Sequence, residues 1–404
     1  MSDHNLSGRV WATAALVAAP LMPATNLGWW FPLHLALLGT ITQVIVGGQL
    51  MFSATLGLSR GPSRRVTLTQ LALLNLGAIL VIGGRLWDSR TALALGAATV
   101  TIAIVWVLSL VDRLWRHSVN RRFTITGTFY RLAGVSIIFG ATIGGALGIG
   151  AFSNASSYVN HRSVHMALNV LGWAGLTVVG TAITLLPTIL HVRAPKLRTL
   201  RAVPWLMFGG LTLLVTGNSI GFGPLAGVGM ASYAAGLATF AVYVRKVLST
   251  PRRRQVPTAA LHLVAALAWL GFTALSLVVV SATADHAALR DLVVVGGAGG
   301  FAFQAVLGAW SFLLPSTRAP LPELRRRELV AMELGGRAQV IVYNIGLVAV
   351  LVGLRSGIDS ALAGTVFVWI AAAWALAKSW GFPLLASLPA VRERSERWWA
   401  EPDR

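Results

Sequence analysis

The segment HMALNVLGWAGLTVVGTAITLLP, residues 165–187, places a histidine at the start of a long apolar run with regularly spaced glycines and a late proline. Gly172 and Gly180 are eight residues apart, and Pro187 follows the second glycine by seven residues. Ionisable side chains are rare in such runs because their burial in a membrane is costly. The segment therefore predicts a membrane-spanning helix, with His165 as a candidate functional residue.

Parts of this pattern recur about 130 residues earlier and later, which indicates an internal repeat. The earlier copy contains His34, Gly39 and Gly48, and the later copy contains Gly300, Gly308 and Pro315. A second motif follows each copy and contains Gly77 and Gly84, then Gly210 and Gly217, then Gly346 and Gly353. Glycines seven or eight residues apart share one helix face and allow close contact with a neighbouring helix. We interpret most of these glycines as packing positions.

The composition is that of an integral membrane protein. Of the 404 residues, 55% are hydrophobic and only 11% are charged, whereas soluble domains have about 25% charged residues. Cysteine is absent, which excludes disulfides, thiolate metal sites, iron–sulfur clusters and covalently attached c-type haem. We attribute the net charge of +20 to basic loops that set membrane topology, and not to nucleic-acid binding.

Twelve runs are long and apolar enough to span a membrane, which takes about 20 residues. They are residues 9–28, 31–57, 66–84, 91–111, 129–152, 164–190, 201–217, 220–246, 257–281, 289–315, 338–354 and 359–378. We interpret the first run as a span and not as a cleaved signal peptide, because no convincing small-residue cleavage site follows it.

The distribution of basic residues supports the same count. With the N-terminus inside the cell, five of the 33 Lys and Arg residues fall in outer loops, which leaves 28 on the inner side. The five are Arg85, Arg90, Arg162, Arg290 and Arg355. The sequence therefore predicts a plasma-membrane protein with twelve spans and both termini in the cytoplasm.

The repeat divides these spans into three pseudo-symmetric units of four helices, approximately residues 9–111, 129–246 and 257–378. An even number of spans gives all units the same orientation, so their symmetry axis should run along the membrane normal. We expect one all-α membrane domain over residues 1–390 and a polar cytoplasmic tail over residues 391–404.

Four of the eight histidines fall near the outer ends of equivalent helices: His34, His161, His165 and His286. His161 precedes His165 by four residues, so the two share a helix face. Neutral imidazole is a common ligand of metals and of haem iron. We interpret His34 and His165 as candidate cofactor ligands and all four as candidate metal ligands. The alternative is that His34 and His165 only form hydrogen bonds at the membrane interface.

The other ionisable groups are weaker candidates for a functional site. His4, His117, His191 and His262 are expected in solvent or among lipid headgroups. Acidic residues are almost absent from the predicted spans, which weighs against a proton-coupled transporter.

Twelve spans in three units, with histidines near the outer ends of the second and sixth helices, resemble subunit I of the haem–copper oxidases. Residues 34–48, 165–195 and 299–315 are similar to degenerate relatives of that subunit. These relatives include the NnrS-type haem membrane proteins and actinobacterial membrane proteins labelled as copper oxidases. In the superfamily, the second-helix histidine is an axial ligand of a low-spin haem and the sixth-helix histidine binds copper. The resemblance therefore implies the fold, and it implies His34 and His165 as haem or copper ligands.

The sequence also departs from that family. The expected seventh helix, residues 201–217, lacks the paired copper-binding histidines, and Val293 occupies the third-unit position equivalent to His165. Asn169 stands where the best-known oxygen-reducing enzymes have a tyrosine four residues after the sixth-helix histidine. These departures argue against complete reduction of oxygen or nitric oxide.

We therefore expect a multi-pass membrane protein that binds haem or copper on its outer side. Its role would be electron transfer, or metal or nitric oxide handling, beside an extracytoplasmic copper protein or electron carrier. Whether the protein is an enzyme is left open. The alternatives are a cofactor-free permease on the same scaffold and a membrane assembly partner without chemistry.

Overall fold

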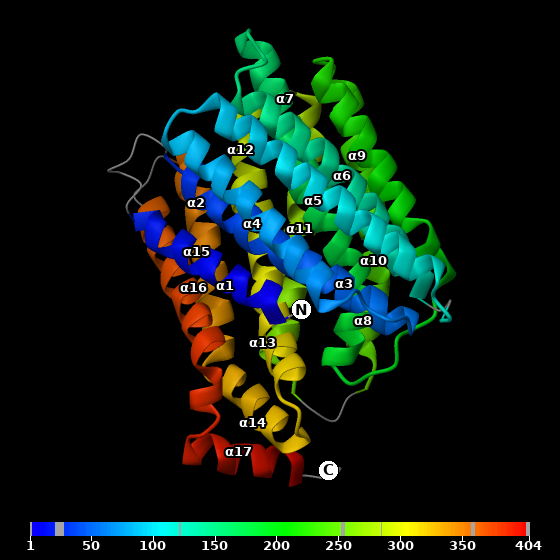
Figure 1. The fold of residues 1–404 in the computed structure, drawn as a ribbon, viewed down its shortest axis with the longest axis vertical. Coiled ribbons are helices and arrows are strands. Elements are labelled where there is room, and N and C mark those ends of the chain that lie inside the picture. The colour runs from blue at the N-terminus through cyan, green and yellow to red at the C-terminus, as the bar shows by residue number, and fades with distance from the viewer. Residues whose placement is uncertain are drawn as a thin grey trace.

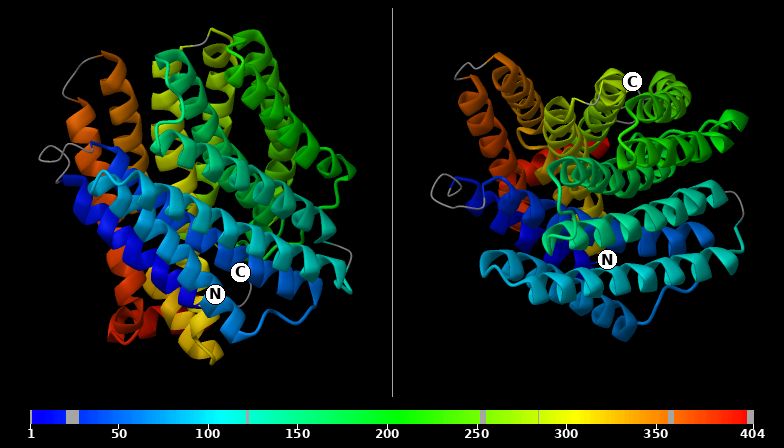
Figure 2. Two further views of the ribbon diagram at one scale, coloured as in Figure 1. Left: turned by 45° about the horizontal axis from the view of Figure 1, so that its top comes forward. Right: turned by 90° about the horizontal axis from the view of Figure 1, so that it is seen from above.

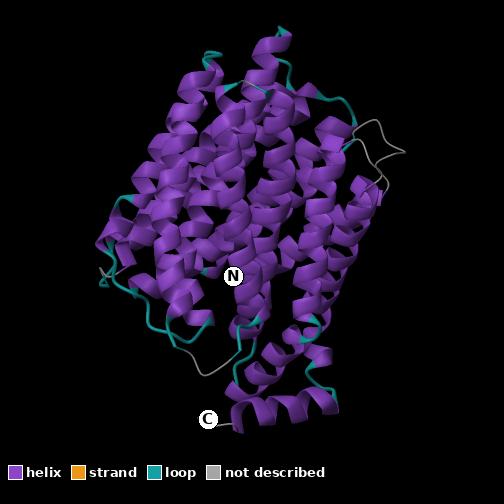
Figure 3. Cartoon of the chain, turned by 180° about the vertical axis from the view of Figure 1, so that it is seen from behind, coloured by secondary structure: helices purple, strands orange, loops and turns teal. Residues whose placement is uncertain are grey.

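The computed structural model describes residues 2–20, 28–120, 123–251, 255–283, 285–356 and 360–400, and the regular elements in these ranges are all helices (Figure 1, Figure 3). Among the described residues, eleven helices are long and apolar enough to cross a membrane. Large apolar side chains such as Ile102, Leu275 and Leu362 lie exposed on the outside of the bundle, as expected for a surface that contacts lipid. The prediction of an all-α membrane protein is confirmed.

The helices follow the order expected from the repeat. The first unit contains α1 (Ser2–Ala18), α2 (Trp30–His34), η2 (Leu35–Ile41), α3 (Thr42–Gly57), α4 (Arg64–Leu86) and α5 (Arg90–Arg116). The second contains α6 (Thr124–Gly148), α7 (Ala155–Ala167), η4 (Leu168–Leu176), α8 (Thr177–Ile189), η5 (Arg198–Arg201), α9 (Val203–Ser219) and α10 (Gly223–Ser249). The third contains α11 (Thr258–Ala282), α12 (His286–Asp291), η6 (Leu292–Phe303), α13 (Gln304–Arg318), α14 (Pro322–Glu333), α15 (Gly336–Ser356) and α16 (Ser360–Leu385), and α17 (Pro389–Ala400) follows it. Seen from above, the blue, green and orange helices of the three units occupy different sectors of the bundle (Figure 2).

Each unit packs its first helix against its second in the same register. A Cβ atom at Gly39 would lie 2.6 Å from the Trp11 ring, and one at Gly47 would lie 2.7 Å from His4 Cβ. The equivalent contacts join Gly172 to Ser136 and Gly180 to Phe129 in the second unit, and Gly300 to Trp269 and Gly308 to His262 in the third. The glycines therefore allow close helix approach, as predicted.

The third and fourth helices also pack alike. Cβ atoms at Gly77, Gly210 and Gly346 would each lie less than 3.0 Å from backbone atoms of the fourth helix of the same unit. Two units share one more contact, because the indole of Trp11 donates to Asn75 (2.7 Å) and that of Trp269 donates to Asn344 (2.7 Å). The repeated glycine and asparagine positions thus make equivalent contacts.

The second helix of every unit contains a π-helical segment: η2, η4 and η6. Such segments are rare, and they occur frequently at functional sites. Gly39, Gly172 and Gly300 lie inside these segments. The extra residue per turn changes the direction of the side chains that precede each segment, which include His34 and His165.

The first predicted span, residues 9–28, differs from the structure. Helix α1 begins at Ser2 and has 17 residues, so it falls outside the set of eleven long helices, and residues 21–27 lie outside the described part of the chain. The early start buries His4 and Asn5 against the bundle, with 1% and 2% of their surfaces exposed. His262 is 0% exposed. The expectation that His4 and His262 are solvated is therefore wrong, because both pack against glycines of a neighbouring helix.

The C-terminal part contains two helices that the sequence analysis did not predict. Helix α14 occupies a predicted inner loop, and α17 covers most of the predicted polar tail. Both lie at the lower end of the bundle in Figure 1. We call the end with the Arg-rich loops the basic end, and the opposite end, where α7 and α12 begin, the outer end, after the predicted topology.

Candidate functional site

His34 and His165 lie side by side at the outer end. His34 is the last residue of α2 and directly precedes η2, and His165 is in the last turn of α7, three residues before η4 begins. Their ring centroids are 6.3 Å apart, and the ring planes differ by only 7°. The structure therefore brings together the two residues that the sequence singled out as cofactor ligands, and it places them closer than ligands of two separate cofactors would need to be.

Both imidazoles are held in one tautomer by backbone carbonyls. His34 Nδ1 lies 2.8 Å from the carbonyl oxygen of Trp30, and His165 Nδ1 lies 2.8 Å from that of Gly140. A carbonyl can only accept, so Nδ1 must carry the proton in each ring and Nε2 keeps its lone pair. Metal-binding histidines are typically oriented by a hydrogen bond of this kind.

The surroundings of the pair fix the two rings in place. The indole of Trp30 stacks on His34 with 4.0 Å between ring centroids. A Cβ atom at Gly144 would lie 2.5 Å from His165 Cε1, so helix α6 borders that ring directly. Asn169 Nδ2 donates to the carbonyl oxygen of His165 (2.6 Å). It also lies 3.2 Å from His165 Nδ1, but a protonated Nδ1 cannot accept from it.

The other two candidate ligands lie apart from this pair. The His161 ring stacks on Phe152, and its Nδ1 donates to the carbonyl oxygen of Ser157 (2.8 Å). His286 Nδ1 lies 3.3 Å from Ser163 Oγ. Within the described residues, no three His, Cys, Asp or Glu side chains come close enough to hold a metal together. A metal at this end would therefore have two protein ligands, His34 and His165.

The distance between the ring centroids can be compared with that of two imidazoles whose Nε2 atoms face each other across a metal ion. Two metal–nitrogen bonds of about 2.0 Å, plus about 1.1 Å from each nitrogen to its ring centroid, separate the centroids by about 6.2 Å. The observed separation is 6.3 Å. Imidazole binds copper and iron, and haem iron takes axial histidines. The close packing of Trp30 and Gly144 around the rings favours the smaller group, a copper ion.

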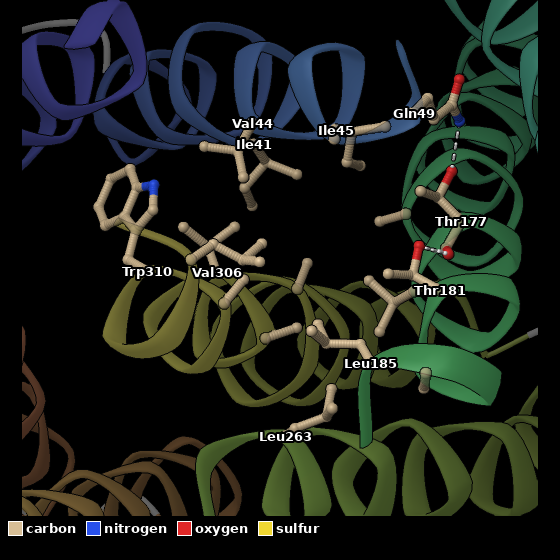
Figure 4. Close-up of a pocket in the computed structure, with 18 of the residues that line it drawn as sticks. Ile41, Val44, Ile45, Gln49, Thr177, Thr181, Leu185, Leu263, Val306 and Trp310 are labelled. Atoms are coloured by element: carbon tan, nitrogen blue, oxygen red, sulfur yellow. Dashed lines mark hydrogen bonds between the residues drawn. The ribbon is translucent and has the colours of Figure 1, made fainter. Parts of the chain in front are cut away.

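A cavity of about 70 Å³ lies farther inside the bundle, between α3, α8 and α13 (Figure 4). Side chains from all three units line it, including Ile41, Val44, Leu185, Val306 and Trp310. At its edges, Gln49 Nε2 donates to Thr177 Oγ1 (2.9 Å) and Trp310 Nε1 donates to Asn5 Oδ1 (3.2 Å). The lining residues are uncharged, so the cavity suits only a small neutral molecule.

A buried ionic group at the basic end was not predicted from the sequence. Glu328 of α14 is 0% exposed and pairs with Arg318 of α13. Burial raises the pKa of the Glu328 carboxyl, and the Arg318 guanidinium acts in the opposite direction. Nearby, Lys378 Nζ donates to the carbonyl oxygens of Met332 (3.0 Å) and Leu334 (3.3 Å). The available signal in the sequence was Pro322, which is typical of a helix start.

No protein-family model matches the sequence, and no curated protein matches it.

Proposed function

We propose that this protein binds one redox metal, a copper ion or a haem iron, between His34 and His165 at the outer end. The observation that carries the proposal is the pair of parallel imidazoles 6.3 Å apart. Each is fixed by an Nδ1 hydrogen bond to a backbone carbonyl, so that Nε2 is the atom left to bind a metal.

We further propose that the scaffold is that of haem–copper oxidase subunit I, with most of its chemistry lost. Support comes from three units with equivalent glycine contacts and from a π-helical segment in the second helix of each unit. In that superfamily, the second and sixth helices serve different cofactors, whereas here their histidines lie together. One shared metal between them agrees with the absence of copper-binding histidines in α9, whose sequence is VPWLMFGGLTLLVTGNS.

A bound copper or iron would supply one-electron redox chemistry. The chain itself holds the two ligand rings in place and shields them with Trp30 and helix α6. The basic loops at the other end support the proposal that this site faces the outside of the plasma membrane. We therefore propose electron transfer, or metal or nitric oxide handling, with an extracytoplasmic copper protein or electron carrier as the partner.

The test is to purify the protein from cells grown with added copper and to measure its absorption spectrum and metal content. A haem gives a strong Soret band, whereas copper appears in the metal analysis without that band. In either case, His34→Ala and His165→Ala should each lose the metal, because a two-ligand site does not survive with one ligand. His161→Ala is the matched control, because His161 lies on α7 with His165 but its Nδ1 donates to the carbonyl oxygen of Ser157.

A wild-type protein without haem or copper would refute the proposal. Loss of metal in His165→Ala and His161→Ala, but not in His34→Ala, would instead assign the site to the two histidines of α7.

The central cavity supports the second candidate function, a cofactor-free permease. A permease needs a binding place near the middle of the bundle, and this cavity lies where the three units meet. Its volume of about 70 Å³ and its uncharged lining limit the substrate to a small neutral molecule. Uptake of such a molecule by vesicles that contain the His34→Ala variant separates the two functions, because only the permease would keep its activity.

A further inference from the structure

The first and third units share a buried polar pair near the basic end. In the first unit, His4 of α1 faces α3, and its Nδ1 lies 2.9 Å from Gln43 Oε1. We call these residues the unit-1 pair. In the third unit, His262 of α11 packs against Gly308, as His4 packs against Gly47. Gln304 precedes Gly308 by four residues, as Gln43 precedes Gly47. His262 and Gln304 are the unit-3 pair.

The two pairs differ in their hydrogen bonds. In the unit-1 pair, imidazole and carboxamide bond directly, and His4 Nε2 and Gln43 Nε2 are left without partners among the described residues. In the unit-3 pair, both side chains are 0% exposed. Neither nitrogen of His262 and neither polar atom of Gln304 has a partner among the described residues. Four buried polar atoms without partners are unfavourable, and in proteins an internal water molecule usually bonds to such groups.

The second unit shows how the same place is filled without polar groups. Phe129 packs against Gly180 where the other units have histidine, and Leu176 stands where they have glutamine. Both side chains are 0% exposed. The scaffold therefore does not require polar residues at these positions for packing.

Polar groups continue from the unit-3 pair to the basic end. Thr258 lies one helical turn before His262, and both its backbone N–H and its hydroxyl donate to the Glu333 carboxylate (2.6–3.0 Å). Glu333 ends α14, beside the carbonyls that accept from Lys378. Water at the unit-3 pair would thus have hydrogen-bonding neighbours in the direction of the basic loops.

We propose that His262 and Gln304 form a hydrated site, in which internal water bridges imidazole and carboxamide and exchanges with solvent at the basic end. The site is separate from the outer histidine pair, and it does not depend on any metal.

Solid-state nuclear magnetic resonance of protein with 15N-labelled histidine, in bilayers, tests this proposal. We expect magnetisation transfer from water to the His262 ring, with the signal identified by its loss in His262→Phe. Gln304→Leu, which copies the second unit, should abolish the transfer at His262 and leave the His4 signal unchanged. Gln43→Leu is the matched control and should leave the transfer at His262 unchanged.

If His262→Phe does not fold, the signal that changes in Gln304→Leu but not in Gln43→Leu identifies His262. A His262 ring without transfer from water would overturn the proposal. A direct hydrogen bond between His262 and Gln304, detected as a coupling between their side chains, would overturn it as well. The unit-3 pair would then be bonded directly, like the unit-1 pair, without bridging water.

Discussion

The two ends of the bundle use the three units differently. At the outer end, the first and second units carry His34 and His165, whereas the third has Val293 in the position equivalent to His165. At the basic end, the first and third units carry a His–Gln pair, whereas the second has Phe129 and Leu176. The glycine contacts are the same in all units, so packing alone is satisfied by apolar residues. Where a unit keeps a histidine, a role besides packing is the better explanation.

This comparison requires that glycine contacts, and not the variable side chains, hold the units together. Gly210→Leu should have the largest effect of the variants considered, since a Cβ there would lie 2.5 Å from the carbonyl oxygen of Gly229. We expect a loss of about 3 kcal/mol or more in the free energy of unfolding, or no folded protein, because overpacking against backbone cannot relax easily. The yield and the thermal midpoint in detergent measure this.

The neighbouring residue provides the control. A Cβ at Gly209 would meet nothing within 4 Å, so Gly209→Leu should change stability by no more than about 0.5 kcal/mol. A similar loss of unfolding free energy in both variants would show that the glycine contacts do not hold the units together.

The second prediction concerns the outer end alone. Gly144→Ala should push the His165 ring out of place, because the new methyl group would lie 2.5 Å from Cε1 and 2.7 Å from Nδ1. Displacement of a residue that orients a metal ligand typically lowers metal affinity about 10–100-fold. Gly148→Ala, on the same helix, meets its nearest atom at 3.6 Å and should bind metal like the wild type. Metal titration of the two variants makes the comparison. Equal metal affinities would show that His165 is not part of the metal site.

Much of the fold could be predicted from the sequence. Hydropathy placed eleven of the spans, because long apolar runs and basic loops are strong signals. Glycine spacing predicted the contacts within each unit, since a missing side chain marks close approach. The start of α1 was predicted wrongly because polar residues such as His4 and Asn5 suggest a tail, and only the partner helix shows that they are buried.

The site could be predicted only in part. The positions of His34 and His165 in apolar runs singled them out, but their mutual distance is a result of tertiary packing. Residue spacing alone also does not show the adjoining π-helical segments. His262 was misplaced because a histidine beside a basic loop looks solvated. Its burial follows from the contact with Gly308. The partners of His161 and His286 come from tertiary packing, which no local pattern predicts.

The third prediction tests the basic end in the first unit. Gln43→Leu removes the partner of His4 Nδ1 and should cost about 1–3 kcal/mol, the usual penalty for a buried polar group left unpaired. The double variant His4→Phe/Gln43→Leu copies Phe129 and Leu176 and should recover most of that loss, because no polar group then remains unpaired. Thermal midpoints of the two single variants and the double variant form the cycle. A double variant as unstable as the sum of the single variants would mean that the first unit cannot adopt the packing of the second.

The smallest effect is expected at two adjacent glycines of α3. Gly48 borders the central cavity, and a Cβ there would meet nothing within 4 Å. Gly48→Ala should therefore stabilise the protein by roughly 0.5–1 kcal/mol, because alanine loses less backbone entropy than glycine in a helix. Gly47→Ala gains the same term but places its methyl group 2.7 Å from His4 Cβ, so it should be destabilising. The signs of the two changes in thermal midpoint therefore test whether Gly47 faces α1 and Gly48 faces the cavity. Two changes of the same sign would contradict that arrangement. A stabilised Gly48→Ala that also reduced the uptake of a small neutral molecule would favour the permease over the metal protein.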